Sequence, residues 1–262
     1  MLAFIAIINN VDWIEIEKPA PVLNTPHFRS VFGGSDGSVV QRDASGHPRS
    51  FEFVALAGMT FRIIRRIEEC ILQVSHETYP SRALFIDQRF GTIRKGPYRQ
   101  AKPSLPDFDT ILARMQERVG TPYIWGGNWA DGIPELLSWY PPQKSLDKHM
   151  KILWTLQGLD CSGLLYEATR GATLRNTSQL IYCGNPIDKI EALRPLDMII
   201  YPGHVLFVRD QHTVIESRFP EGVCIADLKE RLQDLHSSRQ QVSQWPPQIE
   251  SHKSFIVRRI GF

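Results

Sequence analysis

The segment LDCSGLLYEATRG at 159–171 constrains this chain more than any other, because it joins a predicted helix to a cysteine in its first turn. Leu164, Leu165 and Ala168 recur at helical spacing, which indicates a helix that buries this side. At the start of a helix, unpaired backbone N–H groups and the positive end of the helix dipole favour a thiolate. The segment therefore predicts Cys161 as a nucleophile, with a buried structural cysteine as the alternative.

The segment GHVLFVRDQHTVIESR at 203–218 predicts a β-hairpin that turns near 209–212. His204 stands at the start of its first strand. Beside the thiol of Cys161, this imidazole would be the general base of a cysteine hydrolase. A histidine packed in the core or exposed on the surface is the alternative.

A third group should orient the imidazole, and the register of the hairpin selects it. Side chains of a strand alternate between its faces, so an odd number of loop residues places Glu216 on the face of His204. An even number offers Ser217 instead. His212, at the turn, would lie about 13 Å along the ladder, which is too far. We choose Glu216, whose carboxylate can accept the ring N–H and stabilise an imidazolium.

The rest of the chain indicates two domains of different class. Up to residue 96, short strand-like runs alternate with turn clusters such as GGSDGS and DASGHP, a pattern typical of a small all-β barrel. The polar, proline-bearing stretch at 95–106 marks a boundary, so we predict domains at 1–103 and 104–262. The second domain is predicted to be α+β, with helices first and an antiparallel sheet after them. An aromatic, proline-rich insertion fills 128–157.

Composition argues for or against several classes of protein. The formal net charge is +2 and no long basic run concentrates it, so the charge itself argues neither for nor against nucleic acid. We expect no nucleic-acid partner. The four cysteines show neither close pairing nor metal-ligand spacing, so neither a disulfide framework nor a metal site is expected. The opening MLAFIAIINN is too short for a membrane span and lacks a basic region and a cleavage site. We expect it to form a first strand and the protein to be cytoplasmic, with an already lost leader as the alternative.

Five segments resemble the signature blocks of the NlpC family of bacterial cell-wall cysteine peptidases, in the same order. They look like that family's YxWGG, DCSGL, PRxS, LxPGDL and HVGI blocks, and the similarity covers about 107–218. The five segments are GTPYIWGG (120–127), DCSGLLY (160–166), RNTSQL (175–180), LRPLDMIIY (193–201) and GHVLFV (203–208). The combination of DCSG with a downstream GHV is a specific sign of this resemblance.

The resemblance implies a papain-like fold and hydrolysis of the bond between D-γ-glutamate and a diamino acid, diaminopimelate or lysine, in murein peptides. By this match Cys161 is the nucleophile and His204 the base. Glu216 occupies the third polar position, where the family usually has His, Asn or Gln. No metal and no organic cofactor is implied.

Four further residues match positions that line the family's substrate cleft: Tyr123, Asp160, Ser162 and Ser178. In members that act on free murein peptides, the counterpart of Asp160 binds the N-terminal ammonium of L-alanine, as a carboxylate can. A plain helix cap is the alternative for Asp160, and simple packing is the alternative for Tyr123.

The N-terminal half resembles the bacterial Src-homology-3-like barrels that precede such catalytic domains, chiefly through APVLNTPHFRSVF at 20–32. In related two-domain enzymes this barrel restricts substrates to short peptides with a free N-terminus. We therefore expect short murein-derived peptides as the partner, in cell-wall recycling or remodelling. The sequence does not predict an oligomeric state.

The chain departs from the family pattern at three places. The insertion is longer than in most members, and its aromatic residues would either roof the cleft or decorate the surface; they include Trp129, Trp139, Tyr140 and Trp154. Leu206 replaces the glycine of HVGI, and Glu216 replaces an amide or imidazole. Two other functions stay open: a wall-peptide binding module with a disabled site, and an acyltransferase or amidase that uses the same Cys–His pair.

Overall fold

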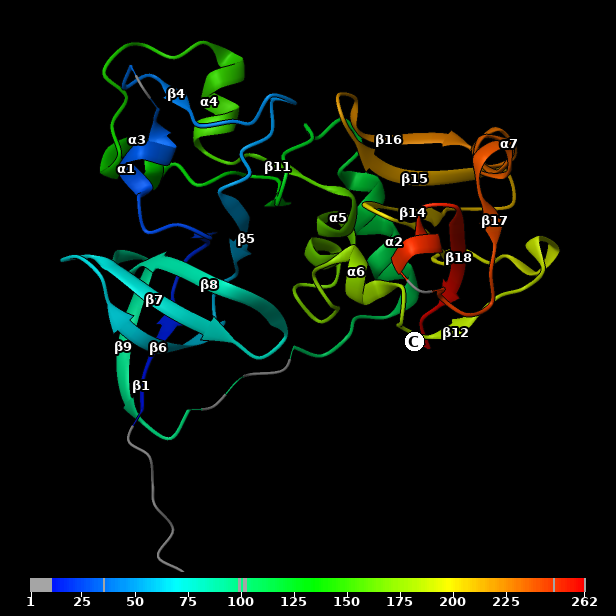
Figure 1. Cartoon of the computed structure of the whole chain (residues 1–262), viewed down its shortest axis with the longest axis horizontal. Coiled ribbons are helices and arrows are strands. Elements are labelled where there is room, and N and C mark those ends of the chain that lie inside the picture. Colours follow the sequence, from blue (N-terminus) through cyan, green and yellow to red (C-terminus); the bar gives the residue numbers. More distant parts are fainter. Residues whose placement is uncertain (1–10, 35, 99, 101–102, 247, 262) are drawn as a thin grey trace, which may run out of the picture. The chain divides into compact units, whose positions relative to one another are not determined.

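The computed structural model describes residues 11–34, 36–98, 100, 103–246 and 248–261, so the first strand expected at 1–10 lies outside the described residues. The chain forms two compact units (Figure 1). Unit 1 comprises Met1–Lys102 and Ile133–Asp147, and unit 2 comprises Pro103–Gly132 and Lys148–Phe262. The first boundary falls beside the expected one, but the chain crosses between the units twice more.

Unit 1 is built on a seven-stranded antiparallel sheet with the order β5-β2-β8-β7-β6-β1-β9. Its strands are β1 (Val11–Ile16), β2 (Ala20–Leu23), β5 (Phe51–Ala55), β6 (Thr60–Arg66), β7 (Ile71–His76), β8 (Tyr79–Asp87) and β9 (Gly91–Gly96). Apolar residues alternate with more exposed ones, as in β1, where Ile14 and Ile16 are buried. Among the described strands no ladder joins the edges β5 and β9, so the Src-homology-3-like barrel stays a prediction. Short α1 (Phe28–Val31), β3 (Phe32–Gly33), β4 (Val39–Val40) and η1 (Gln88–Phe90) complete this half.

The segment Ile133–Asp147 packs within unit 1, whereas the sequence predicts the whole insertion in the second domain. After α3 (Glu135–Trp139), the ring of Tyr140 stacks on Phe28 and on Phe32, at centroid distances of 5.7 and 5.5 Å. Tyr140 is buried, so this part of the insertion is core rather than surface decoration. Sequence continuity suggested one domain, but the ring of Tyr140 is buried in the other.

Unit 2 is α+β, as the sequence predicts. Its sheet has the order β12-β18-β13-β14-β15-β16 with antiparallel neighbours along this path, and β17 pairs parallel to β18. The strands are β12 (Asn185–Pro186), β13 (Met198–Tyr201), β14 (His204–Val208), β15 (Thr213–Arg218), β16 (Gly222–Asp227), β17 (Gln240–Gln241) and β18 (Ser254–Arg259). The hairpin predicted at 203–218, with its turn near 209–212, is confirmed as β14 and β15.

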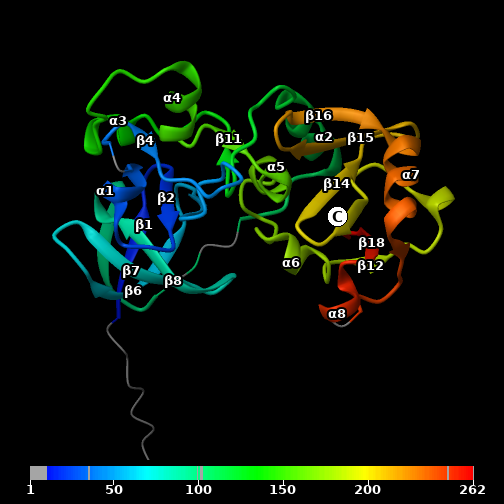
Figure 2. The ribbon, with the colours of Figure 1, turned by 45° about the horizontal axis from the view of Figure 1, so that its top comes forward.

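The two faces of this sheet are covered by different helices. On one face Val205 and Phe207 pack against Leu164 of α5 (Cys161–Ala168). On the other, Leu206 and Val208 pack against α7 (Leu228–Ser238), which Figure 2 shows along the sheet. Leu206, where the family has glycine, is thus an ordinary buried residue under α7. The remaining elements are α2 (Phe108–Glu117), β10 (Asn128–Trp129), α4 (Lys148–Trp154), β11 (Gly158–Leu159), α6 (Thr177–Leu180), η2 (Ile190–Ala192) and α8 (Gln248–Ser251).

Within the described parts of the chain, none of the helices has both the length and the apolar character that crossing a bilayer requires.

Candidate active site

Cys161 is the first residue of α5, and the local sequence explains its position. Asp160 caps the helix, because its Oδ1 accepts a hydrogen bond of 2.6 Å from the backbone N–H of Gly163. Gly163 has no room for a side chain, since a Cβ there would lie 1.9 Å from the carbonyl oxygen of Gly127. The thiol is buried; its Sγ lies 3.8 Å from the carbonyl oxygen of Gly203 and 3.7 Å from Oγ1 of Thr177.

His204 and Glu216 lie on the same face of the hairpin, because the loop has an odd length. Phe207 pairs with Ile215 and Val208 with Val214, which leaves the five residues 209–213 between the paired positions. The ring Nε2 of His204 lies 2.7 Å from Oε2 of Glu216. Ser217, the candidate for an even loop, points to the other face and donates a hydrogen bond of 2.7 Å to the carbonyl oxygen of Leu159.

The thiol of Cys161 is the second partner of the imidazole. Burial alone would lower the pKa of His204, but hydrogen bonds with Cys161 and Glu216 raise it to about 9. Because Nε2 faces the carboxylate, Nδ1 is the ring nitrogen left for the thiol. The three residues thus form a chain from sulfur through imidazole to carboxylate, the arrangement that activates a nucleophile.

Arg231 of α7 completes this cluster, and sequence reasoning did not find it. Its Nη2 donates a hydrogen bond of 3.1 Å to Oε2 of Glu216, and its Nε lies 2.9 Å from Oε1 as an ion-pair contact outside hydrogen-bond geometry. Burial alone would raise the pKa of Glu216, but His204 and the nearby arginines lower it. The available signal was an arginine within the buried stripe of Leu228, Leu232 and Leu235.

Asp160 faces a guanidinium of the chain itself. Arg175, which is buried, donates hydrogen bonds of 3.0 and 2.7 Å to the two carboxylate oxygens of Asp160. It also donates one of 2.8 Å to Oγ of Ser162. The helix cap that was the alternative for Asp160 is present, and its ammonium-binding role stays a prediction. Arg175 is the first residue of the RNTSQL block but was not proposed as a site residue.

The other two predicted cleft residues lie on segments next to the nucleophile. Tyr123 forms a bridge with Leu159, and its ring meets that of Phe219 edge-on at 6.0 Å. Ser178 lies in α6 beside Thr177, whose hydroxyl is near the sulfur. Thr177 is therefore a neighbour of the thiol that the sequence prediction passed over.

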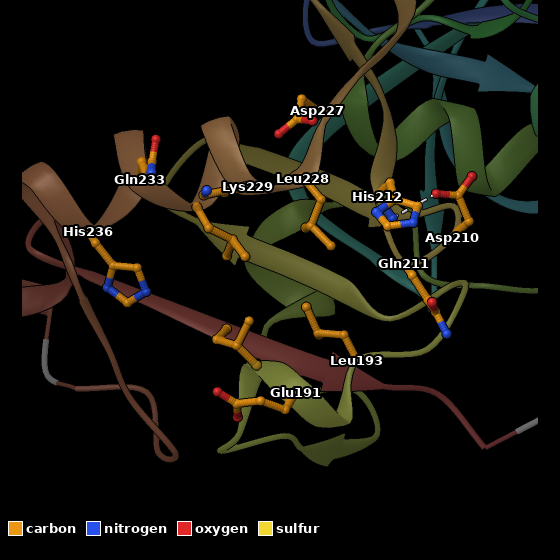
Figure 3. A pocket seen from close by; sticks show the side chains of 12 residues that line it. Glu191, Leu193, Asp210, Gln211, His212, Asp227, Leu228, Lys229, Gln233 and His236 are labelled. Carbon is orange, nitrogen blue, oxygen red and sulfur yellow. Dashed lines mark hydrogen bonds between the residues drawn. The ribbon is translucent and has the colours of Figure 1, made fainter.

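A separate hollow of about 640 Å³ opens in unit 2 (Figure 3). Aliphatic side chains such as Leu193 and Leu228 lie beside charged ones such as Glu191 and Lys229. None of Cys161, His204 and Glu216 belongs to its lining, so the hollow is not evidence for the catalytic cluster.

Comparison with known proteins gives distant structural similarities only. No family model and no curated protein matches the chain. An NlpC/P60 family protein from Bacillus cereus is 16% identical with a TM-score of 0.38, over 95% of this chain and 63% of that one. NlpC1 from Trichomonas vaginalis is 13% identical with a TM-score of 0.34, over 84% of this chain and 66% of that one.

RipD from Mycobacterium tuberculosis, described as a non-catalytic NlpC/p60 domain protein adapted to peptidoglycan binding, is 21% identical with a TM-score of 0.34, over 50% of this chain and 90% of that one. The match to the Bacillus protein covers 63% of that protein, so this chain spans less than two thirds of its length. All three TM-scores lie below 0.5, so the chemistry of the site depends on its own geometry.

Proposed function

We propose that unit 2 is a cysteine peptidase of the NlpC type, with Cys161 as nucleophile, His204 as base and Glu216 as the residue that orients the imidazole. The observation that carries the proposal is the imidazole placed between a thiol and a carboxylate, with 2.7 Å between Nε2 and Oε2. The ordered resemblance of five sequence segments to NlpC blocks supports the same assignment.

The mechanism is acyl transfer. His204 accepts the thiol proton, and the thiolate of Cys161 attacks the carbonyl carbon of the substrate. Backbone N–H groups at the start of α5, including that of Cys161, stabilise the resulting oxyanion. The imidazolium protonates the leaving amine, the C–N bond breaks, and an acyl-enzyme remains. Water, deprotonated by His204, then releases the acid and restores the thiol.

For the substrate we propose a short murein peptide, cut between D-γ-glutamate and diaminopimelate or lysine. This rests on the sequence resemblance, as do the cleft positions Tyr123, Asp160, Ser162 and Ser178. A free N-terminal ammonium would have to share Asp160 with Arg175, which already occupies both carboxylate oxygens. We also propose that the protein acts in the cytoplasm on recycled peptides, with unit 1 as a Src-homology-3-like domain.

Product analysis tests this function. The protein would be incubated with L-Ala-γ-D-Glu-diaminopimelate and the matching tetrapeptide, each with a free and an acetylated N-terminus, and the products identified by mass spectrometry. We expect release of L-Ala-D-Glu from the free peptides. Binding of the peptides without cleavage would replace the proposal with the binding module, and transfer to an added amine would replace it with an acyltransferase.

A further inference from the structure

We propose that Arg231 is a positioning residue of this site, which acts through Glu216 to keep that carboxylate ionised and aimed at His204 throughout the reaction. The inference rests on the proposed function and deepens it, because it concerns the same catalytic cluster. It also explains how this chain uses a carboxylate at a position where an amide or imidazole is usual.

The contacts place the guanidinium of Arg231 directly against the carboxylate of Glu216. The side chain of Glu216 is fully buried, and only 16% of that of Arg231 is exposed. The guanidinium reaches both carboxylate oxygens, at 2.9 and 3.1 Å, while Oε2 also faces the ring of His204 at 2.7 Å. Glu216 thus contacts a permanent cation, Arg231, and a titrating one, His204.

This arrangement answers a problem that a buried carboxylate creates in the proposed mechanism. His204 alternates between neutral and charged, and a buried carboxylate whose partner becomes neutral tends to take up a proton. A protonated Glu216 would donate to Nε2 instead of accepting from it, which would select the wrong tautomer for accepting the thiol proton at Nδ1. Arginine keeps its charge at every relevant pH, so Arg231 compensates Glu216 in both states of His204.

Several titratable or charged groups surround Glu216, and Arg231 contacts its carboxylate directly. Titratable or charged groups face the His204–Glu216 pair from each packed element: Cys161 of α5, Tyr201 of β13, Arg218 of β15, Cys224 of β16 and Arg231 of α7. Arg218 acts on Glu216 through space and hydrogen-bonds Cys224. Tyr201, whose pKa burial raises, hydrogen-bonds Arg231 and helps to hold it.

An imidazole titration separates this role from an ordinary structural ion pair, and it needs no substrate. Isotope-edited NMR would follow His204 in the full chain, in the wild type, in Arg231→Met and in Arg231→Lys. If Arg231 keeps Glu216 ionised, its loss lets Glu216 take up a proton, and a neutral Glu216 no longer stabilises the imidazolium. Arg231→Met should therefore lower the pKa of His204 by about half a unit to one unit, whereas loss of a merely nearby charge would raise it. Arg231→Lys, which keeps the charge, should shift it much less.

Lys229→Met is the matched control, because it removes a positive charge from the same helix at a residue that lines the separate hollow. It should leave the pKa of His204 unchanged. A folded Arg231→Met protein in which the pKa of His204 is unchanged or raised would overturn the inference. Should Arg231→Met not fold, Arg231→Gln, which keeps a donor without the charge, decides in the same way.

A double-mutant cycle then tests whether Arg231 acts through Glu216. Arg231→Met should lower kcat/KM about tenfold in the wild-type background and by less than about twofold when Glu216 is already glutamine. Equal losses in the two backgrounds would overturn the inference. If the wild type cleaves no murein peptide, the proposed function fails, and the titration alone still decides the role of Arg231.

Discussion

Two buried carboxylates, one in each unit, are held in closely similar ways and serve different ends. In unit 1, Asp87 is paired with Arg89, whose Nε lies 3.0 Å from each oxygen, and it accepts a hydrogen bond of 2.6 Å from the hydroxyl of Tyr140. In unit 2, Glu216 is paired with Arg231 and accepts from His204. Each carboxylate therefore has one arginine and one ring as partners.

The difference lies in the ring. Burial and the neighbouring Asp87 raise the pKa of Tyr140 well above its ordinary value, so this hydroxyl keeps its proton and only ties the segment Ile133–Asp147 to unit 1. His204 titrates at about 9 and has a thiol as its other partner. A buried arginine–carboxylate pair is therefore structural where its third partner, like the hydroxyl of Tyr140, keeps its proton. The same pair can take part in proton transfer where that partner, like the imidazole of His204, gains and loses a proton.

Loss of the nucleophile should give the largest effect. Cys161→Ala removes the atom that forms the acyl-enzyme, so peptide hydrolysis should fall at least about a thousandfold. The free energy of unfolding should change little, since alanine keeps most of the buried volume. Cys183→Ala, at a half-buried thiol that donates to the carbonyl oxygen of Gln179, is the control. Unchanged turnover in Cys161→Ala would show that Cys161 is not the nucleophile. Glu216 would then no longer differ from Asp87 by belonging to a proton relay.

Replacement of the carboxylate should have the next largest effect. Glu216→Gln keeps the shape and can still accept from His204 but no longer stabilises the imidazolium, so kcat/KM should fall about 10- to 100-fold. The loss should be smaller than that of Cys161→Ala in the same assay. A rate equal to the wild type would mean that Glu216, like Asp87, is structural only.

The pH dependence should show a smaller and gradual effect. Protonated His204 donates to the leaving amine, so kcat/KM should decline as the pH rises through about 9. The pKa of His204 is raised from 6.5, so its contribution to stability is complete below about pH 6.5 and is lost as the pH rises through about 9. Rate and unfolding profiles from pH 6 to 10.5 measure both, and Glu216→Gln should move the alkaline limb to lower pH.

Removal of one hydroxyl in unit 1 should give the smallest effect. Tyr140→Phe deletes the hydrogen bond to Asp87, which should cost about 1–3 kcal/mol in the free energy of unfolding. The pKa of His204 should not move. Tyr182→Phe, at an exposed tyrosine, is the matched control and should cost almost nothing. A shift in the titration of His204 on Tyr140→Phe would show that the two clusters are not independent.

Local patterns were enough to predict the central part of the candidate site. Helical spacing placed Cys161 at the first turn of a helix. The two-residue period of a strand narrowed the third group to Glu216 or Ser217, and the chemistry of a carboxylate favoured Glu216. Both inferences hold because the geometry of a helix turn or a hairpin is set by residues close together in sequence.

Contacts between distant elements could not be predicted in this way. Arg231 reaches Glu216 only because α7 folds back across the sheet, and Arg175 reaches Asp160 because the loop after α5 returns to its cap. The segment Ile133–Asp147 is continuous in sequence with the second domain, but the buried ring of its Tyr140 packs on Phe28 in unit 1.

The sequence by itself determined which residues can carry the chemistry and which faces of their own elements they occupy, because those follow from the short periods of helix and strand. The tertiary structure decided which charges surround them and which unit each inserted segment joins. Those depend on burial between elements far apart in the chain, which no local period encodes.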